Sequence, residues 1–131
     1  MARAKAAKGS TPRVTTLKKR AEFLRVRKGA RYATRAFVLE AKARGDDPAR
    51  PADEPRFGFT VTKQVGKAVA RNRIRRRLKA AVRDTAPGLA KGEFDYVLIA
   101  RRPALESQFA ALVSELAKAF ARVHRAPARV R

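Results

Sequence analysis

The sequence contains no cysteine and no tryptophan, and its one histidine is His124. Without cysteine, the chain can form neither disulfides nor thiolate metal sites. No apolar run approaches the roughly 20 residues of a membrane-spanning helix, and the N-terminus lacks the apolar stretch of a secretory signal. We therefore expect a soluble protein that works in the cytoplasm and has no membrane partner.

Acidic residues are scarce: Asp and Glu number 11, against 33 Lys and Arg, and the formal net charge is +22. A charge of this size indicates a polyanionic partner and says little about the fold. The 131 residues are 45% hydrophobic, which is sufficient for one packed domain with tails. We predict a disordered basic arm over residues 1–15, a single domain over 16–125 and a basic tail over 126–131.

The few carboxylates argue against a catalytic role for the chain itself. A metal-dependent nuclease needs clustered carboxylates, usually around two ions ~4 Å apart, whereas the acids here are scattered along the sequence. A metal-free nuclease needs an acid–base pair, and His124 has no partner near it in the sequence. We expect His124 to face solvent at a helix end, and we predict a binding protein without catalytic or metal-ligating residues.

The most informative stretch, residues 63–83, reads KQVGKAVARNRIRRRLKAAVR and contains nine basic residues and no acidic one. Its apolar side follows helical spacing and comprises Ile74, Leu78, Ala81, Val82 and, just beyond the stretch, Thr85. A solvated helix face normally mixes both signs of charge, and arginine suits bidentate phosphate contacts. The stretch predicts a helix with one side toward its own core and the other toward a nucleic acid.

Apolar periodicity and turn residues predict the remaining elements. In order, we expect a helix over 19–28, an extended stretch over 32–43, a long hairpin loop over 45–55, a strand over 56–63, the basic helix to residue 85, a strand over 95–100 and a helix over 107–124. This order predicts an α+β fold with a mixed sheet covered by helices on one side. Residues 56–100 form a β-α-β crossover, for which general chirality favours the right hand.

The run K-x-x-G-x-A-V-x-R-N-R-I-R-R-R-L, at residues 63–78, resembles the signature of the bacterial ribonuclease P protein subunit. The flanking runs RAEFLRVRKG, RFGFTVTK and DYVLIARRPA support the resemblance, which covers about residues 17–123. It implies an α-β sandwich in the order α-β-β-β-α-β-α with a left-handed crossover, and we adopt that hand for this chain.

The resemblance also implies a function. The family's proteins assist a catalytic RNA that removes the 5′ leader of precursor tRNA. The implied partners are therefore ribonuclease P RNA and the precursor leader, and the protein is expected to be a monomer before assembly. Catalytic groups and Mg²⁺ are expected on the RNA rather than on this chain.

Carried over position by position, the resemblance assigns two sets of residues. The set implied to contact the RNA subunit comprises Lys63, Lys67, Asn72, Arg73, Arg76 and Arg77. The set implied to line a leader cleft between the sheet and the first helix comprises Phe23, Val38, Thr60, Arg71, Arg75 and Lys79. The patterns agree with this division, because the three cations of the second set share one flank of the basic helix, and Val38 and Thr60 point away from the predicted core.

Two positions depart from the family pattern. Arg27 stands where many relatives carry a second aromatic residue, and Glu40 stands where some carry one on the first long strand. Leader contacts are therefore expected to depend more on charge than on stacking. Phe23 is equally consistent with a core position at this point.

Two other functions are compatible with parts of the sequence. Composition alone would suit a structural RNA-binding protein such as a ribosomal component. An independent endonuclease is disfavoured by the missing carboxylate cluster. The specific motif favours the ribonuclease P subunit over both.

Overall fold

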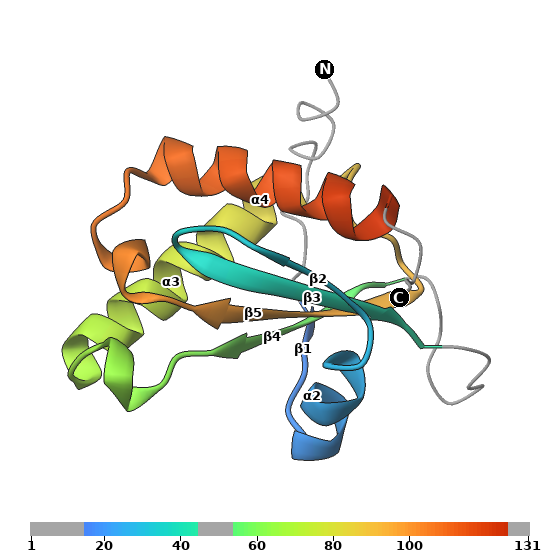
Figure 1. The fold of residues 1–131 in the computed structure, drawn as a ribbon, viewed down its shortest axis with the longest axis horizontal. Helices are drawn as coiled ribbons and strands as arrows, with labels where there is room; N and C mark the ends of the chain where they lie inside the picture. The colour runs from blue at the N-terminus through green and yellow to red at the C-terminus, as the bar shows by residue number, and fades with distance from the viewer. Residues whose placement is uncertain (1–14, 45–53, 126–131) are drawn as a thin grey trace.

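The computed structural model describes residues 15–44 and 54–125 of the chain (Figure 1). Its elements, in order, are β1 (Thr15–Thr16), α2 (Arg20–Val26), β2 (Ala30–Ala33), β3 (Phe37–Ala43), β4 (Arg56–Thr60), the 3-10 helix η1 (Lys63–Val65), α3 (Ala68–Thr85), β5 (Phe94–Ala100), the 3-10 helix η2 (Arg102–Leu105) and α4 (Phe109–Arg125). The predicted α+β order is confirmed, with β1 as an addition. Thr15, which we assigned to the basic arm, belongs to β1, while the rest of the arm and the tail lie outside the described residues.

The strands form one mixed sheet in the order β1-β4-β5-β3-β2. β4 and β5 are adjacent and parallel, so α3 connects them as the predicted β-α-β crossover. β3 pairs antiparallel with β5 on its other side, and β2 pairs antiparallel with β3. The left hand of the crossover stays a prediction from the family resemblance.

The predicted hairpin between β3 and β4 is wrong, because β5 lies between these two strands and pairs with both. The central place of β5 explains its nearly unbroken run of buried residues, since a central strand covered on both faces has no solvent side. Most of the loop predicted over 45–55 lies outside the described residues.

The extended stretch predicted over 32–43 is two strands, β2 and β3, joined by a turn at residues 34–36. Thr34 forms the turn: its hydroxyl oxygen accepts the backbone N–H groups of Ala36 at 3.2 Å and Phe37 at 3.1 Å. Threonine hydroxyls stabilise turns in this way. The sequence analysis missed the turn because neither Gly nor Pro marks it.

Helices cover both faces of the sheet. α3 and α4 lie on one face, and α2 lies on the opposite face (Figure 1). Our expectation that the helices share one side is therefore wrong for α2. Among the helices that the structure describes, none has the length and apolarity needed to cross a lipid bilayer.

The main core lies between the sheet and the pair α3 and α4. Alternate strand residues point into it, including Phe57 of β4 and Tyr96 of β5, whose rings stack at 5.0 Å between centroids. The buried residues of α3 are the five that periodicity predicted: Ile74, Leu78, Ala81, Val82 and Thr85. Fully burying one large aliphatic side chain, such as that of Ile74 or Leu78, contributes about 1.5–3 kcal/mol to the stability of the fold. This burial fixes which side of α3 faces outward.

Candidate RNA interface

The outer face of α3 carries the cations of the sequence signature. Because Ile74 and Leu78 are fully buried, the residues on the other side of the helix face solvent. Five of the six residues assigned to the RNA subunit are exposed: Lys63, Lys67, Asn72, Arg73 and Arg76. Phosphate contacts require accessible cations and polar side chains, so these five residues lie where a polyanion can reach them.

Arg77 differs from the other five. Its side chain is half-buried, and one guanidinium N–H group donates a hydrogen bond to the backbone carbonyl of Ser107. Ser107 follows η2, so this bond ties α3 to the segment that leads into α4. Its engagement makes Arg77 less available to RNA than Arg73 or Arg76, although its assigned contact stays a prediction.

Val38 and Thr60, assigned to the leader cleft, lie in one row across the sheet. Both are aligned with Ile99 of β5, Val38 from β3 and Thr60 from β4. The row lies on the face that carries α2, opposite the main core, as strand parity predicted. Ile99 and Thr60 are half-buried, so α2 does not cover this row completely. Sequence analysis missed Ile99, although its parity in β5 could have identified it.

Phe23 projects from α2 onto the same face of the sheet. A Cβ atom added to Gly58 would lie 2.5 Å from the Phe23 ring, so the ring packs directly on the backbone of β4. Phe23 is half-buried and also packs against the cluster formed by Leu17, Val26 and Val97. Phe23 therefore has one packed side and one accessible side, which is compatible with both the core position and the leader contact considered for it.

The remaining cleft candidates, Arg71, Arg75 and Lys79, form the predicted flank of α3, and all three are half-buried. The Lys79 ammonium lies 5.8 Å from the centre of the Phe59 ring, which places this flank beside β4. α3 and α2 lie on opposite faces of the sheet (Figure 1). The edge of β4 therefore separates this flank of α3 from the row that contains Thr60. β1 pairs with β4 only at Arg56 and Phe57, so it does not extend along this part of the edge.

Residues 11–124 match the family model described as Ribonuclease P. The chain belongs to this family. The ribonuclease P protein component of Brucella suis is 45% identical over 112 residues, which cover 83% of this chain and 79% of that protein. The component of Gluconacetobacter diazotrophicus is 48% identical over 106 residues, which cover 79% of this chain and 86% of that protein.

Solved structures of the ribonuclease P family have the same fold. The RNase P protein of Staphylococcus aureus superposes with a TM-score of 0.67 at 28% identity, covering 85% of this chain and 98% of that one. The RNase P protein from Thermotoga maritima gives a TM-score of 0.68 at 26% identity, covering 82% of this chain and 96% of that one. These matches confirm the predicted family and fold class.

Family membership assigns the role of the chain. As a ribonuclease P protein, it is the protein component of a ribonucleoprotein endoribonuclease that processes tRNA, and its partner is the ribonuclease P RNA. The predicted role as the protein subunit of ribonuclease P is confirmed, and the ribosomal alternative has no support.

The ribonuclease P fold here contains a buried ion cluster that the sequence analysis did not find. Asp95, at the start of β5, is completely buried and accepts hydrogen bonds from three arginines. Arg44 donates at 2.7 Å, Arg56 at 2.7 and 2.9 Å, and Arg25 at 2.9 Å. Burial alone would raise the pKa of the Asp95 carboxyl, but the hydrogen bonds from Arg56, Arg44 and Arg25 outweigh it and hold the pKa below its ordinary value.

Glu22 extends the same cluster into α2. One carboxylate oxygen pairs with Arg56 at 3.1 Å, and the other accepts the backbone N–H groups of Lys18 and Lys19 at the start of the helix. Arg25, also on α2, binds Asp95 of the sheet. The cluster therefore fastens this seven-residue helix, and with it Phe23, to the sheet.

Glu40 is a second buried carboxylate on the α2 face of the sheet. It lies opposite Val97 on β5 and Arg31 on β2. Arg31 Nη1 lies 3.7 Å from Glu40 Oε2. This oxygen accepts no hydrogen bond from the described residues. Burial raises the pKa of Glu40, with partial compensation from Arg31 and Arg27. Glu40, which departs from the family pattern, is therefore a buried carboxylate on the face of the sheet that carries α2.

His124 does not face solvent, which corrects our expectation. It is half-buried, its Nε2 lies 2.6 Å from the Tyr96 hydroxyl, and its ring packs edge-on against Phe94. The Tyr96 hydroxyl accepts the backbone N–H of Lys91 and can therefore donate to a neutral imidazole. Burial lowers the pKa of His124, which favours that neutral form. His124 anchors the end of α4 to the core.

In the part of the chain that the structure describes, carboxylates and histidine do not gather into a metal site. Across residues 15–44 and 54–125, no group of three or more metal-binding side chains comes together. Mg²⁺ bound by the RNA stays a prediction.

Proposed function

We propose that this protein binds ribonuclease P RNA with the outer face of α3 and holds the 5′ leader of precursor tRNA against the sheet beside α2. The observation that carries the leader site is the row of Val38, Ile99 and Thr60. This row lies on a face that α2 covers only in part, and Phe23 lies beside it. The two surfaces are distinct, so one protein can contact both RNAs at once.

In this proposal the chain contributes binding and orientation. The cations of α3 lower the repulsion between two RNA backbones, and the half-buried flank of Arg71, Arg75 and Lys79 guides the leader across the β4 edge. A leader held in a fixed direction brings its junction with the mature tRNA to the catalytic RNA. Mg²⁺ held by that RNA supplies the chemistry of hydrolysis. The protein works as a monomer in the cytoplasm.

Reconstitution tests the proposal. Added to a bacterial ribonuclease P RNA at low Mg²⁺, the protein should restore cleavage of the 5′ leader. Cleavage by the protein without the RNA would instead indicate an endonuclease. No effect on the RNA would contradict the proposal.

The leader site is tested by comparing two ligands. The reconstituted holoenzyme should bind precursor tRNA more tightly than mature tRNA, because only the precursor has a leader. Thr60→Arg, which fills the row beside the β4 edge, should reduce this difference. Thr62→Arg is the matched control, since Thr62 is exposed just beyond β4. Equal affinity of the wild-type holoenzyme for both tRNAs would refute the leader site.

A further inference from the structure

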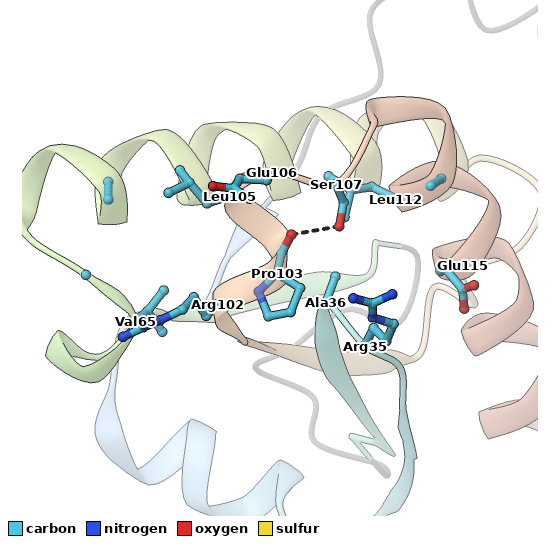
Figure 2. A pocket seen from close by; sticks show the side chains of 13 residues that line it. Arg35, Ala36, Val65, Arg102, Pro103, Leu105, Glu106, Ser107, Leu112 and Glu115 are labelled. Carbon is cyan, nitrogen blue, oxygen red and sulfur yellow. Dashed lines mark hydrogen bonds between the residues drawn. The ribbon is translucent and has the colours of Figure 1, made fainter.

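A pocket of about 820 Å³ opens between the start of α3, η2 and the start of α4 (Figure 2). Its lining comes from segments that are far apart in the sequence, including Ala36 just before β3, Gly66 and Ala70 around the start of α3, and Ala111 on α4. Its volume lies within the range of about 300–1,000 Å³ that is usual for small-ligand sites. Neither assigned set of RNA-binding residues includes a residue of this lining.

The walls of the pocket are mainly apolar. Val65, Pro103, Leu105 and Leu112 provide aliphatic surface, and small residues leave room between them. Such a lining suits the face of a planar, uncharged group. It does not suit a phosphate, which would lose its hydration without gaining donors.

The charged groups of the pocket are balanced. Arg35 and Arg102 line it together with Glu106 and Glu115, in a chain whose formal net charge is +22. Figure 2 shows Arg35 and Glu115 on the same side of the pocket. Guanidinium groups can stack on a base or donate to its acceptors, and carboxylates accept from its amino groups. This combination fits the polar edge of a nucleobase.

The position of the pocket relates it to RNA. Val65, Gly66 and Ala70 belong to the signature segment, in which Lys63, Lys67 and Arg73 are exposed. RNA phosphates along these cations would bring a nucleotide to the pocket. Proteins commonly recognise RNA through unstacked bases that enter such sites. We propose that the pocket receives one unpaired nucleobase of ribonuclease P RNA, an inference that rests on the proposed contact between α3 and that RNA.

Hydrogen bonds hold the walls in place. The Ser107 hydroxyl donates to the Pro103 carbonyl at 2.7 Å (Figure 2), and the Ser107 carbonyl accepts from Arg77 of α3. Arg102 donates to the carbonyl of Gln64 in η1 at 3.3 Å. A preformed wall reduces the ordering cost of binding. This gives Arg77 a positioning role, in addition to the contact assigned to it from the resemblance.

Filling the pocket tests the proposal. Ala111→Trp places a large side chain in the pocket from an exposed position on α4, and Ala110→Trp places the same side chain on the neighbouring exposed position, outside the lining. Both proteins are titrated with the full ribonuclease P RNA, and the RNA is probed with base-specific reagents. Ala111→Trp should weaken RNA binding by roughly 5- to 150-fold, the range for one stacked base. One base protected by the wild-type protein should become reactive, and Ala110→Trp should change neither result.

Three outcomes separate the alternatives. Equal affinity and equal protection for the two variants would overturn the proposal. Weaker binding of Ala111→Trp without a newly reactive base would also overturn it, because the pocket would then contact only sugar or phosphate. If the wild-type protein itself fails to bind the RNA, the proposed function fails first. Circular dichroism of both variants verifies that the fold is retained.

Discussion

Asp95→Asn should strongly destabilise the protein, because Asp95 is the shared acceptor of three arginines. Asparagine keeps the shape of the side chain but removes its charge and replaces one acceptor oxygen with a donor. Arg44, Arg56 and Arg25 would then face one another around an uncharged group. The side chain of Arg44 is 2% exposed, so water cannot replace its lost partner.

The structure sets the size of the effect. Breaking a buried ion pair by removing one partner typically costs about 3–5 kcal/mol. Arg25 is 32% exposed, so solvent screens its share and the two more buried arginines dominate. We expect a loss of roughly 3–5 kcal/mol, a large fraction of the ~5–15 kcal/mol that stabilises an ordinary domain.

Urea unfolding followed by circular dichroism measures this loss. Glu93→Gln is the matched control, because it also removes one negative charge but from an exposed position two residues away. The control should unfold within about 0.5 kcal/mol of the wild type. Equal stabilities of the two variants would refute the proposed importance of the cluster.

The pH dependence provides a second test. The pKa of Asp95 is lowered in the folded protein, so its stabilisation is complete above the ordinary aspartate pKa of 3.8 and is lost as the pH falls through the lower, folded value. The difference between wild type and Asp95→Asn should therefore be constant from neutral pH to about pH 5 and shrink below about pH 4. A difference that grows on acidification would contradict the assignment.

Further predictions concern the two RNA surfaces and the buried side of α3. RNA affinity should fall steeply with salt, at a log–log slope of roughly −0.7 to −0.9 per phosphate contact, and a total slope shallower than about −2 would contradict the cationic interface. Arg73→Glu should weaken RNA binding but leave circular dichroism unchanged. Leu78→Ala should cost ~2–5 kcal/mol of stability, measured by urea unfolding, because its side chain is fully buried. Phe23→Ala should weaken precursor tRNA binding by up to roughly a hundredfold and spare mature tRNA, whereas Leu24→Ala, on the exposed side of α2, should affect neither; equal losses for both tRNAs would make Phe23 purely a packing residue.

Local patterns predicted much of this protein, because they depend on neighbours within one element. The apolar side of α3 was predicted residue by residue, since a helix buries positions three and four apart. The alternation in β4 correctly placed Phe57 toward the core and Thr60 away from it. The net charge and the signature motif together predicted that the partner is RNA.

Other features depended on pairings between distant segments. The sequence did not show that β5 would separate β3 from β4, or that α2 would lie on the face of the sheet opposite α3 and α4. It also did not show the role of Asp95, whose partners Arg56 and Arg25 are 39 and 70 positions away. The sequence shows that Asp95 is charged but not which arginines pair with it, because those partners are set by tertiary packing.

The sequence by itself determined the RNA-binding class of the protein and the side of α3 that faces outward, because both follow from composition and from the period of one helix. Only the tertiary structure decided which cations remain free to bind. Arg73 and Arg77 are indistinguishable as members of one arginine run, yet Arg73 is exposed and Arg77 donates to the Ser107 carbonyl. The physical reason is that η2 packs against α3, and Ser107, just after η2, supplies an acceptor to one flank of that helix. The pocket beside η2 arises from the same packing.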